Sequence, residues 1–192
     1  MIHLMIFSSI SIHQFKNTDT LLLSGLKRIN LFTGRNGCGK TSILEAIDKQ
    51  MIERVGWDKS IWNKYQGTRE LNFEKLESLP KDQFPNTLLI DNIEMGLHYS
   101  EYPSLWVSLI DFAALHNIQL FITTHSYECI ESLVNVCKHQ YPGEELIRLF
   151  RIEKEEWLFR VYNGTKLPIR YNAYAYTQEQ LVAAIENNLE LR

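Results

Sequence analysis

Apolar and polar residues along this chain form short apolar runs separated by longer amphipathic segments. The runs expected to form strands are 4–13, 21–23, 30–33, 87–91 and 119–123. Each of them has the length of a strand, and the run at 87–91 is apolar enough to be a buried central one. Strands that alternate with amphipathic helices are typical of an α/β fold with a parallel or mixed sheet covered by helices. We therefore predict that fold class.

Four segments have the apolar spacing of helices. They are Gly39 to about Arg54, a segment with Pro103 in its first turn, a segment from Ser126 through Val136, and 177–188. Pro is well tolerated in a first turn, and Ser is a favoured N-cap. Their apolar positions recur three or four residues apart, which predicts one buried face on each helix.

Two regions are harder to interpret from the pattern. Residues 56–86 lack clean periodicity, and we expect irregular structure there with one short helix near Phe73 to Leu79. The aromatic residues Trp57, Trp62 and Tyr65 in this region suit either a plug over the core or a partner-docking surface. The pattern of residues 146–162 predicts two strands separated by a turn at 153–156. No linker interrupts the pattern, so we expect one domain over 1–192.

Composition and net charge exclude several classes of function for this protein. The 192 residues are 45% hydrophobic and carry a formal charge of −3, which argues against a basic nucleic-acid footprint over the whole surface. The sequence contains no apolar stretch of the roughly 18 residues that a membrane-spanning helix needs. Cys38, Cys129 and Cys137 are an odd set without a Cys-x-x-Cys pair, which suits a reducing cytosol rather than a disulfide framework or zinc site. We expect a cytoplasmic protein.

The segment Gly34-Arg-Asn-Gly-Cys-Gly-Lys-Thr41 matches the phosphate-binding loop pattern G-x-x-x-x-G-K-[ST], between a predicted strand and a predicted helix. Its glycines allow several backbone N–H groups to point at one phosphate, and the helix N-terminus adds positive potential. The alternative for such a pattern is a glycine-rich structural turn. The residues expected to bind nucleotide are Gly34, Arg35, Asn36, Gly37, Cys38, Gly39, Lys40, Thr41 and Ser42.

A phosphate loop of this kind works with magnesium and with a carboxylate at the end of a neighbouring strand. Asp91 ends the apolar run Leu-Leu-Ile, so we expect Asp91 and Thr41 to hold Mg²⁺. The alternative for Asp91 is a helix-capping role at a strand end. ATP and Mg²⁺ are the expected cofactors.

Four segments together resemble a known group of proteins. Ile10-Ser-Ile-His-Gln-Phe-Lys, GRNGCGKTSILEAI, LLIDNIEMGLHYS and FITTHSYECI are similar to ATPase heads of ATP-binding-cassette type, in the AAA-type group related to overcoming-lysogenisation-defect and DNA-repair ATPases. The resemblance spans nearly the whole chain. It implies a P-loop NTPase fold with a mixed central sheet, an N-terminal antiparallel portion and flanking helices.

The resemblance also implies residue roles. Asp91 matches the magnesium aspartate, and Gly96-Leu97-His98 matches a turn that faces an opposing subunit. His125 matches a switch histidine that senses the γ-phosphate. Without the resemblance, a lone His at a strand end would be interpreted as a hydrogen-bonded turn residue.

Two departures from the group affect the expected activity. Asn92 stands where the group carries the Glu that activates water, and an amide cannot accept that proton. Glu94 is the candidate substitute, although the group carries Glu there too as part of the subunit-facing turn. Lys40 and Asp91 are close in sequence, with no glycine-rich signature element between them, so the helical subdomain that carries it is expected to be deleted.

These observations favour slow hydrolysis of ATP by a subunit of a larger complex, with Lys40, Asp91, Glu94 and His125 as catalytic candidates. The alternatives are a nucleotide-binding module that does not hydrolyse ATP and, less favoured, a small P-loop kinase. The resemblance implies a protein partner, an effector or a second ATPase subunit, in DNA repair or anti-phage defence. Direct nucleic-acid binding stays open, and no membrane contact is expected.

Overall fold

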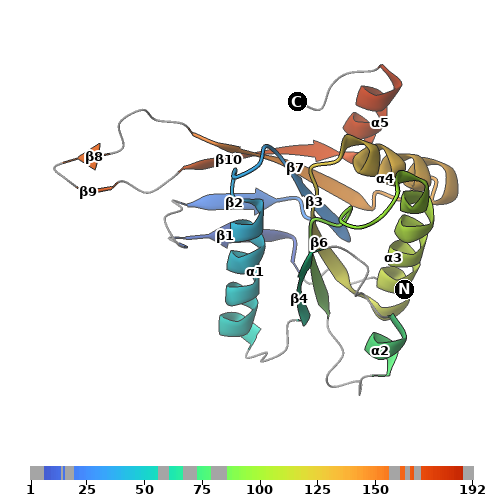
Figure 1. The fold of residues 1–192 in the computed structure, drawn as a ribbon, viewed down its shortest axis with the longest axis horizontal. Coiled ribbons are helices and arrows are strands. Elements are labelled where there is room, and N and C mark those ends of the chain that lie inside the picture. Colours follow the sequence, from blue (N-terminus) through green and yellow to red (C-terminus); the bar gives the residue numbers. More distant parts are fainter. Residues whose placement is uncertain are drawn as a thin grey trace.

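A six-stranded sheet with the order β10-β7-β3-β6-β5-β4 lies at the centre of the computed structural model (Figure 1). The structure describes residues 7–13, 15, 20–55, 61–66, 73–78, 86–155, 161–162, 165–166 and 170–187. Strands β7, β3, β6, β5 and β4 run parallel, and β10 pairs antiparallel with β7. This mixed sheet confirms the predicted α/β class.

The strands of the central sheet are β3 (Ile29–Thr33), β4 (Ile61–Gln66), β5 (Thr87–Asp91), β6 (Gln119–Thr123), β7 (Ile147–Lys154) and β10 (Tyr171–Thr177). Two small antiparallel pairs lie outside it, β1 (Ser9–Ile12) with β2 (Leu21–Ser24) and β8 (Val161–Tyr162) with β9 (Thr165–Lys166). The helices are α1 (Lys40–Val55), α2 (Phe73–Glu77), α3 (Tyr102–His116), α4 (Tyr127–Gln140) and α5 (Gln178–Glu186), with the 3₁₀ helix η3 (Tyr99–Glu101) before α3.

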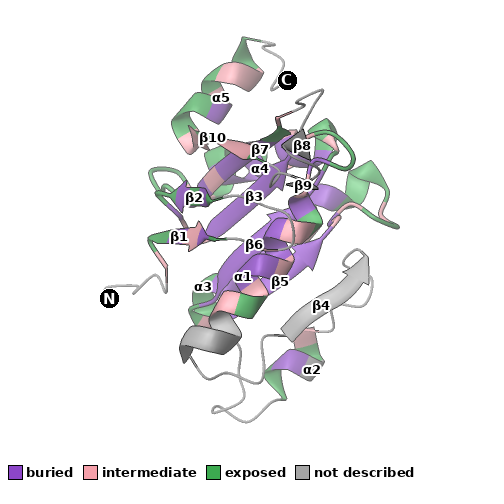
Figure 2. Cartoon of the chain, turned by 90° about the vertical axis from the view of Figure 1, so that its left-hand side faces the viewer, coloured by how far each residue is buried: buried purple, intermediate pink, exposed green. Residues whose placement is uncertain are grey.

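Each face of the sheet has its own hydrophobic core, because successive strand residues point to opposite faces. On β6, Leu120 and Ile122 pack against α3, α4 and α5, whereas Phe121 between them packs toward α1 and the β1–β2 pair. Figure 2 shows the resulting burial of β3, β5 and β6. A strand covered on both faces is mostly apolar, and the central positions of β5 and β6 are accordingly Leu-Leu-Ile and Leu-Phe-Ile. The buried polar Asn30 of β3 is hydrogen-bonded to the carbonyls of Lys27 and Leu120.

Most predicted elements are confirmed. The strands at 21–23, 30–33, 87–91 and 119–123 and the helices after Gly39, near Pro103 and after Ser126 all form. The Ser126 hydroxyl accepts a hydrogen bond from the Cys129 N–H at 3.1 Å, as expected of an N-cap. The N-terminal antiparallel portion forms as a separate two-stranded sheet.

Two predictions are wrong in part. The region 56–86 contains the short helix α2 as expected, but residues 61–66 form the edge strand β4 instead of irregular structure. Trp57 and the side chains of Trp62 and Tyr65 lie outside the described residues. The turn predicted at 153–156 is also wrong where it overlaps β7, which continues to Lys154 and pairs with β10. The charged residues Glu153 and Lys154 are exposed at this end of β7, which explains why a strand end resembles a turn in the sequence.

None of the helices in the described part of the chain combines the length and apolar character needed to cross a bilayer.

Candidate functional site

The loops that follow three adjacent parallel strands meet at one edge of the sheet. Thr33 ends β3, Asp91 ends β5 and Thr123 ends β6, and β6 lies between the other two. Ligands of open α/β sheets bind at the carboxyl ends of parallel strands. The candidate site residues from the sequence lie in these loops, in the first turn of α1 and, for Asp91, at the last position of β5.

The loop from Gly34 to Gly39 has backbone conformations that favour glycine. Gly34, Gly37 and Gly39 have φ values of 140°, 74° and 98°. A Cβ atom at Gly34 would overlap the carbonyl oxygen of Ile152, and one at Gly39 would lie 2.6 Å from Cε1 of Tyr171. The glycines at 34 and 39 are therefore required both by φ and by the close approach of neighbouring strands.

Lys40 is held inside the loop that it follows. Its side chain is buried, and the Nζ atom donates to the carbonyl oxygens of Gly34 at 2.7 Å and Arg35 at 3.1 Å. The ammonium group thus lies at the centre of the loop, at the start of α1. Around it, Cys38 is buried with its sulfur 3.9 Å from Nζ, whereas Arg35 and Asn36 are exposed.

The Asp91 carboxylate accepts hydrogen bonds from two threonine hydroxyls, one in the first turn of α1 and one at the end of β6. Thr41 Oγ1 donates to Asp91 Oδ2 at 2.9 Å, and Thr123 Oγ1 donates to Asp91 Oδ1 at 2.5 Å. The backbone N–H of Asn92 donates in turn to Thr123 Oγ1 at 2.7 Å. Both oxygens of this buried carboxylate are therefore held in fixed directions, next to the first turn of α1.

The backbone at Asn92 is left-handed, with φ of 49°. Asn adopts this conformation more readily than most residues, because its short polar side chain tolerates it. The next residue, Ile93, donates its N–H to the carbonyl of Thr123 at 3.1 Å. The turn after β5 is thus attached to β6 through two backbone donors, from Asn92 and Ile93.

Glu94 and His125 form a pair beside this turn. Glu94 Oε1 lies 2.7 Å from His125 Nδ1 and accepts the backbone N–H of His125 at 3.1 Å. The side chain of Glu94 is 12% exposed and that of His125 is 48% exposed. Because Nδ1 faces Glu94, Nε2 is the ring nitrogen left for another partner. Among the described residues, Glu94 Oε2 is buried without a hydrogen-bond partner.

The charge of Glu94 also acts on its buried surroundings. Burial raises the pKa of the Cys129 thiol to about 12, and the nearby carboxylate of Glu94 contributes to the shift. Burial likewise raises the pKa of the Tyr102 hydroxyl, with Glu94 as a smaller contributor. The carboxylate of Glu94 therefore lies close to two buried side chains, Cys129 and Tyr102, that stay uncharged near neutral pH.

Sequence reasoning missed two residues of this site. Thr123 fixes Asp91 and the Asn92 backbone, yet it was seen only as the end of a strand. Its signal was a hydroxyl in the last position of a buried apolar strand, which needs a partner there. Tyr171 packs against Gly39 from β10, a strand that the pattern did not reveal.

The oxygen atoms around Asp91 fit a magnesium ion. Thr41 and Asp91 offer a hydroxyl and a carboxylate, which are hard oxygen ligands, within hydrogen-bond distance of each other. Magnesium usually takes one or two protein ligands and completes its shell with phosphate and water. No cluster of three or more His, Cys, Asp or Glu side chains suited to an all-protein metal site occurs in the described ranges. The arrangement suits a metal that arrives with a phosphate ligand.

Comparisons with known proteins point to the same chemistry. The AAA domain family matches residues 8–49, which include β1, β2, β3 and the glycine-rich loop. An ATP/GTP phosphatase of Helicobacter pylori is 35% identical over 86 residues, which cover 42% of this chain. The match covers 23% of that relative, so the chain spans only a part of its length. The fold, the glycine-rich loop and these two similarities together support nucleotide binding by this chain.

Proposed function

We propose that this chain binds ATP with Mg²⁺ and hydrolyses it slowly, as the ATPase subunit of a larger complex. The observation that carries the proposal is the placement of Asp91. Its carboxylate accepts from Thr41 in the first turn of α1 and from Thr123 in the sheet, beside a loop built around Lys40. A glycine-rich turn with only a structural role would not need a buried acid at this point.

The loop and Lys40 recognise the phosphates in this proposal. Backbone N–H groups of the loop and the N-terminus of α1 favour bound anions. The ammonium of Lys40 donates to the carbonyls of Gly34 and Arg35 in the structure, and in this proposal it exchanges these acceptors for phosphate oxygens when the nucleotide binds. The charged acceptors make stronger hydrogen bonds than the carbonyls that they replace.

Thr41 and Asp91 are the residues that would hold Mg²⁺. When bound, the ion neutralises negative charge on the phosphates. The protein fixes the directions of the oxygen atoms that would hold the ion. Because Thr123 fixes one carboxylate oxygen of Asp91, the other stays directed at Thr41.

The Glu94–His125 pair takes the place of a glutamate at position 92. Asn92 offers no carboxylate to accept a proton, and a missing general base lowers a rate by about two to four orders of magnitude. With Nδ1–H donating to Glu94, His125 can donate Nε2–H to a phosphate oxygen only as the doubly protonated ring. The second oxygen of Glu94 is a buried acceptor without a hydrogen-bond partner among the described residues, and in this proposal it accepts from the attacking water once that water has entered the site.

The architecture of the complex follows from the resemblance described above. We infer an ATPase head of ATP-binding-cassette type, over 1–192, with the helical signature subdomain deleted. Between Lys40 and the start of β5 at Thr87, the described residues form only α1, β4 and α2. A second subunit is then needed to cover the γ-phosphate. DNA repair and anti-phage defence are the settings in which we place such a complex, in the cytoplasm.

A second candidate function is nucleotide binding without turnover. The observation that favours it is the left-handed backbone at Asn92, which suits an Asn and disfavours the longer Glu. In this case ATP would be a structural or regulatory ligand.

Phosphate release and nucleotide binding, measured side by side, separate the two candidates. We expect the wild type to release phosphate slowly, Lys40→Ala to lose both binding and turnover, and Glu94→Gln to lose turnover but keep binding. Asn92→Asp restores a carboxylate on a residue that tolerates positive φ, so it should release phosphate faster than wild type. If the wild type and Glu94→Gln bind ATP equally and neither exceeds the Lys40→Ala background, the chain does not hydrolyse ATP alone.

A further inference from the structure

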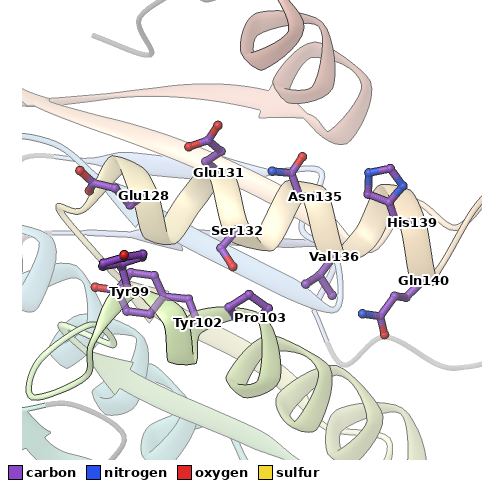
Figure 3. A pocket seen from close by; sticks show the side chains of 10 residues that line it. All are labelled: Tyr99, Tyr102, Pro103, Glu128, Glu131, Ser132, Asn135, Val136, His139 and Gln140. Atoms are coloured by element: carbon purple, nitrogen blue, oxygen red, sulfur yellow. The ribbon is translucent and has the colours of Figure 1, made fainter.

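An open groove of about 420 Å³ lies between α4 and the start of α3. Tyr99, Tyr102 and Pro103 form one wall, and α4 forms the other (Figure 3). Along α4, Ser132 and Val136 point toward α3, while Glu128 and Glu131, which also line the groove, extend from its outer rim away from α3 (Figure 3). None of these side chains belongs to the phosphate site described above.

One buried polar atom of the groove lacks a hydrogen-bond partner within the described part of the protein. The hydroxyl oxygen of Ser132 is buried and makes no hydrogen bond there. Neither Glu128 nor Glu131 forms an ion pair with a described Lys or Arg, although Lys138 farther along α4 pairs with Glu186. Buried polar groups without partners are uncommon, and at a groove they indicate a position that a ligand can satisfy.

The charge of this groove is negative and remains so near neutral pH. Hydrogen bonds from its own backbone N–H and from the Ser126 hydroxyl lower the pKa of Glu128. Glu131 follows one turn later on the same rim. Such a rim attracts Lys and Arg side chains, and it repels nucleic-acid phosphates and anionic lipids.

An exposed aromatic side chain adds a second kind of contact for a cationic ligand in the groove. Tyr99 is 67% exposed at the mouth of the groove, with one side of its ring near His98, at a centroid distance of 4.3 Å. An exposed tyrosine ring next to carboxylates binds a guanidinium both by its π face and through the acids. The apolar side chains of Pro103 and Val136 provide contacts for neighbouring aliphatic groups.

The length of the groove sets the size of its occupant. It extends along α4 from Glu128 to Gln140, which is about 18 Å at the rise of an α-helix. An extended segment of about five residues has that length. We propose that this groove docks a segment of a partner protein in which arginine or lysine side chains alternate with apolar ones.

The probe for this proposal is a labelled twelve-residue peptide with four arginines, two leucines and two tryptophans, compared with the same peptide carrying four glutamates. Fluorescence anisotropy measures its binding to the full chain. We expect the arginine peptide alone to bind. Glu131→Gln and Tyr99→Ala should each weaken it about threefold to fivefold, because each removes one partly exposed contact to a cation. Glu131→Lys should abolish its binding.

Glu74→Gln on α2 is the matched control, because it removes the same charge from an exposed helix position outside the groove. Circular dichroism confirms that each variant is folded, and ATP binding should be unchanged in all of them. The proposal fails if both peptides bind equally, if neither binds, or if Glu74→Gln weakens binding as much as Glu131→Gln. It also fails if sedimentation shows that Tyr99 and Glu131 instead support self-association of this chain.

Discussion

Replacing Thr123 by Val removes one hydroxyl from the centre of the site with almost no change of shape. The side chain of Thr123 is fully buried. Its hydroxyl donates to the carboxylate of Asp91 at 2.5 Å and accepts the N–H of Asn92 at 2.7 Å. The substitution therefore leaves a buried carboxylate oxygen and a backbone N–H without their partner, and it creates no large cavity.

The expected decrease in the free energy of unfolding follows from these two lost contacts. A hydrogen bond to a charged group contributes about 1.5–3 kcal/mol, and a buried donor left unsatisfied costs about 1–3 kcal/mol. We expect the total to be about 3 kcal/mol, toward the lower end of the summed ranges. Thr123→Ser keeps the hydroxyl and loses one methyl group, which should cost about 1 kcal/mol.

Urea unfolding of the three proteins measures the difference directly. We expect the midpoint to fall strongly for Thr123→Val and slightly for Thr123→Ser, with unchanged slopes. MgATP affinity should fall in the same order, because Asp91 loses the contact that fixes its carboxylate. If Thr123→Val is within about 1 kcal/mol of wild type and of Thr123→Ser, the hydroxyl network does not stabilise the site as we describe.

Three further perturbations test other parts of the structure. Gly39→Ala should lower the thermal unfolding temperature more than Gly37→Ala does. Both glycines have positive φ, but only Gly39 lies against the ring of Tyr171. Equal losses would contradict that packing. Ser126→Ala removes the N-cap of α4 and should cost about 1 kcal/mol in urea unfolding, whereas no loss would mean that the cap is dispensable. Burial raises the pKa of Cys129 to about 12, so its thiol should react with Ellman's reagent at pH 8 only after unfolding, and rapid labelling of the native protein would contradict its burial.

The fold was predictable wherever a buried element has a strong pattern. The three central positions of β5 and of β6 are apolar because both faces of the sheet are covered, so these sequences differ clearly from the flanking loops. β10 was missed because it lies at the sheet edge and is only partly buried. An edge strand pairs on one side and needs no continuous apolar run, so its sequence resembles that of a loop.

The phosphate loop of the site was predictable from the sequence, whereas the contacts that hold the other site residues in place were less so. The phosphate loop has a sequence pattern because its backbone geometry requires glycine at fixed positions. The contact between Glu94 and His125 depends on how the turn after β5 lies against the turn after β6. Such contacts between loops far apart in the sequence follow from strand order and register, which local patterns do not reveal.

Calorimetric titration with ATP, with and without Mg²⁺, tests most directly whether the loop at residues 34–41 and Asp91 form one nucleotide site. We expect the wild type to bind MgATP, and Lys40→Ala to bind it at least about tenfold more weakly because a charged hydrogen bond to phosphate is lost. Thr41→Val should remove the contribution of magnesium to the affinity. Equal affinity of all three proteins for MgATP, or no binding by the wild type, would contradict the account.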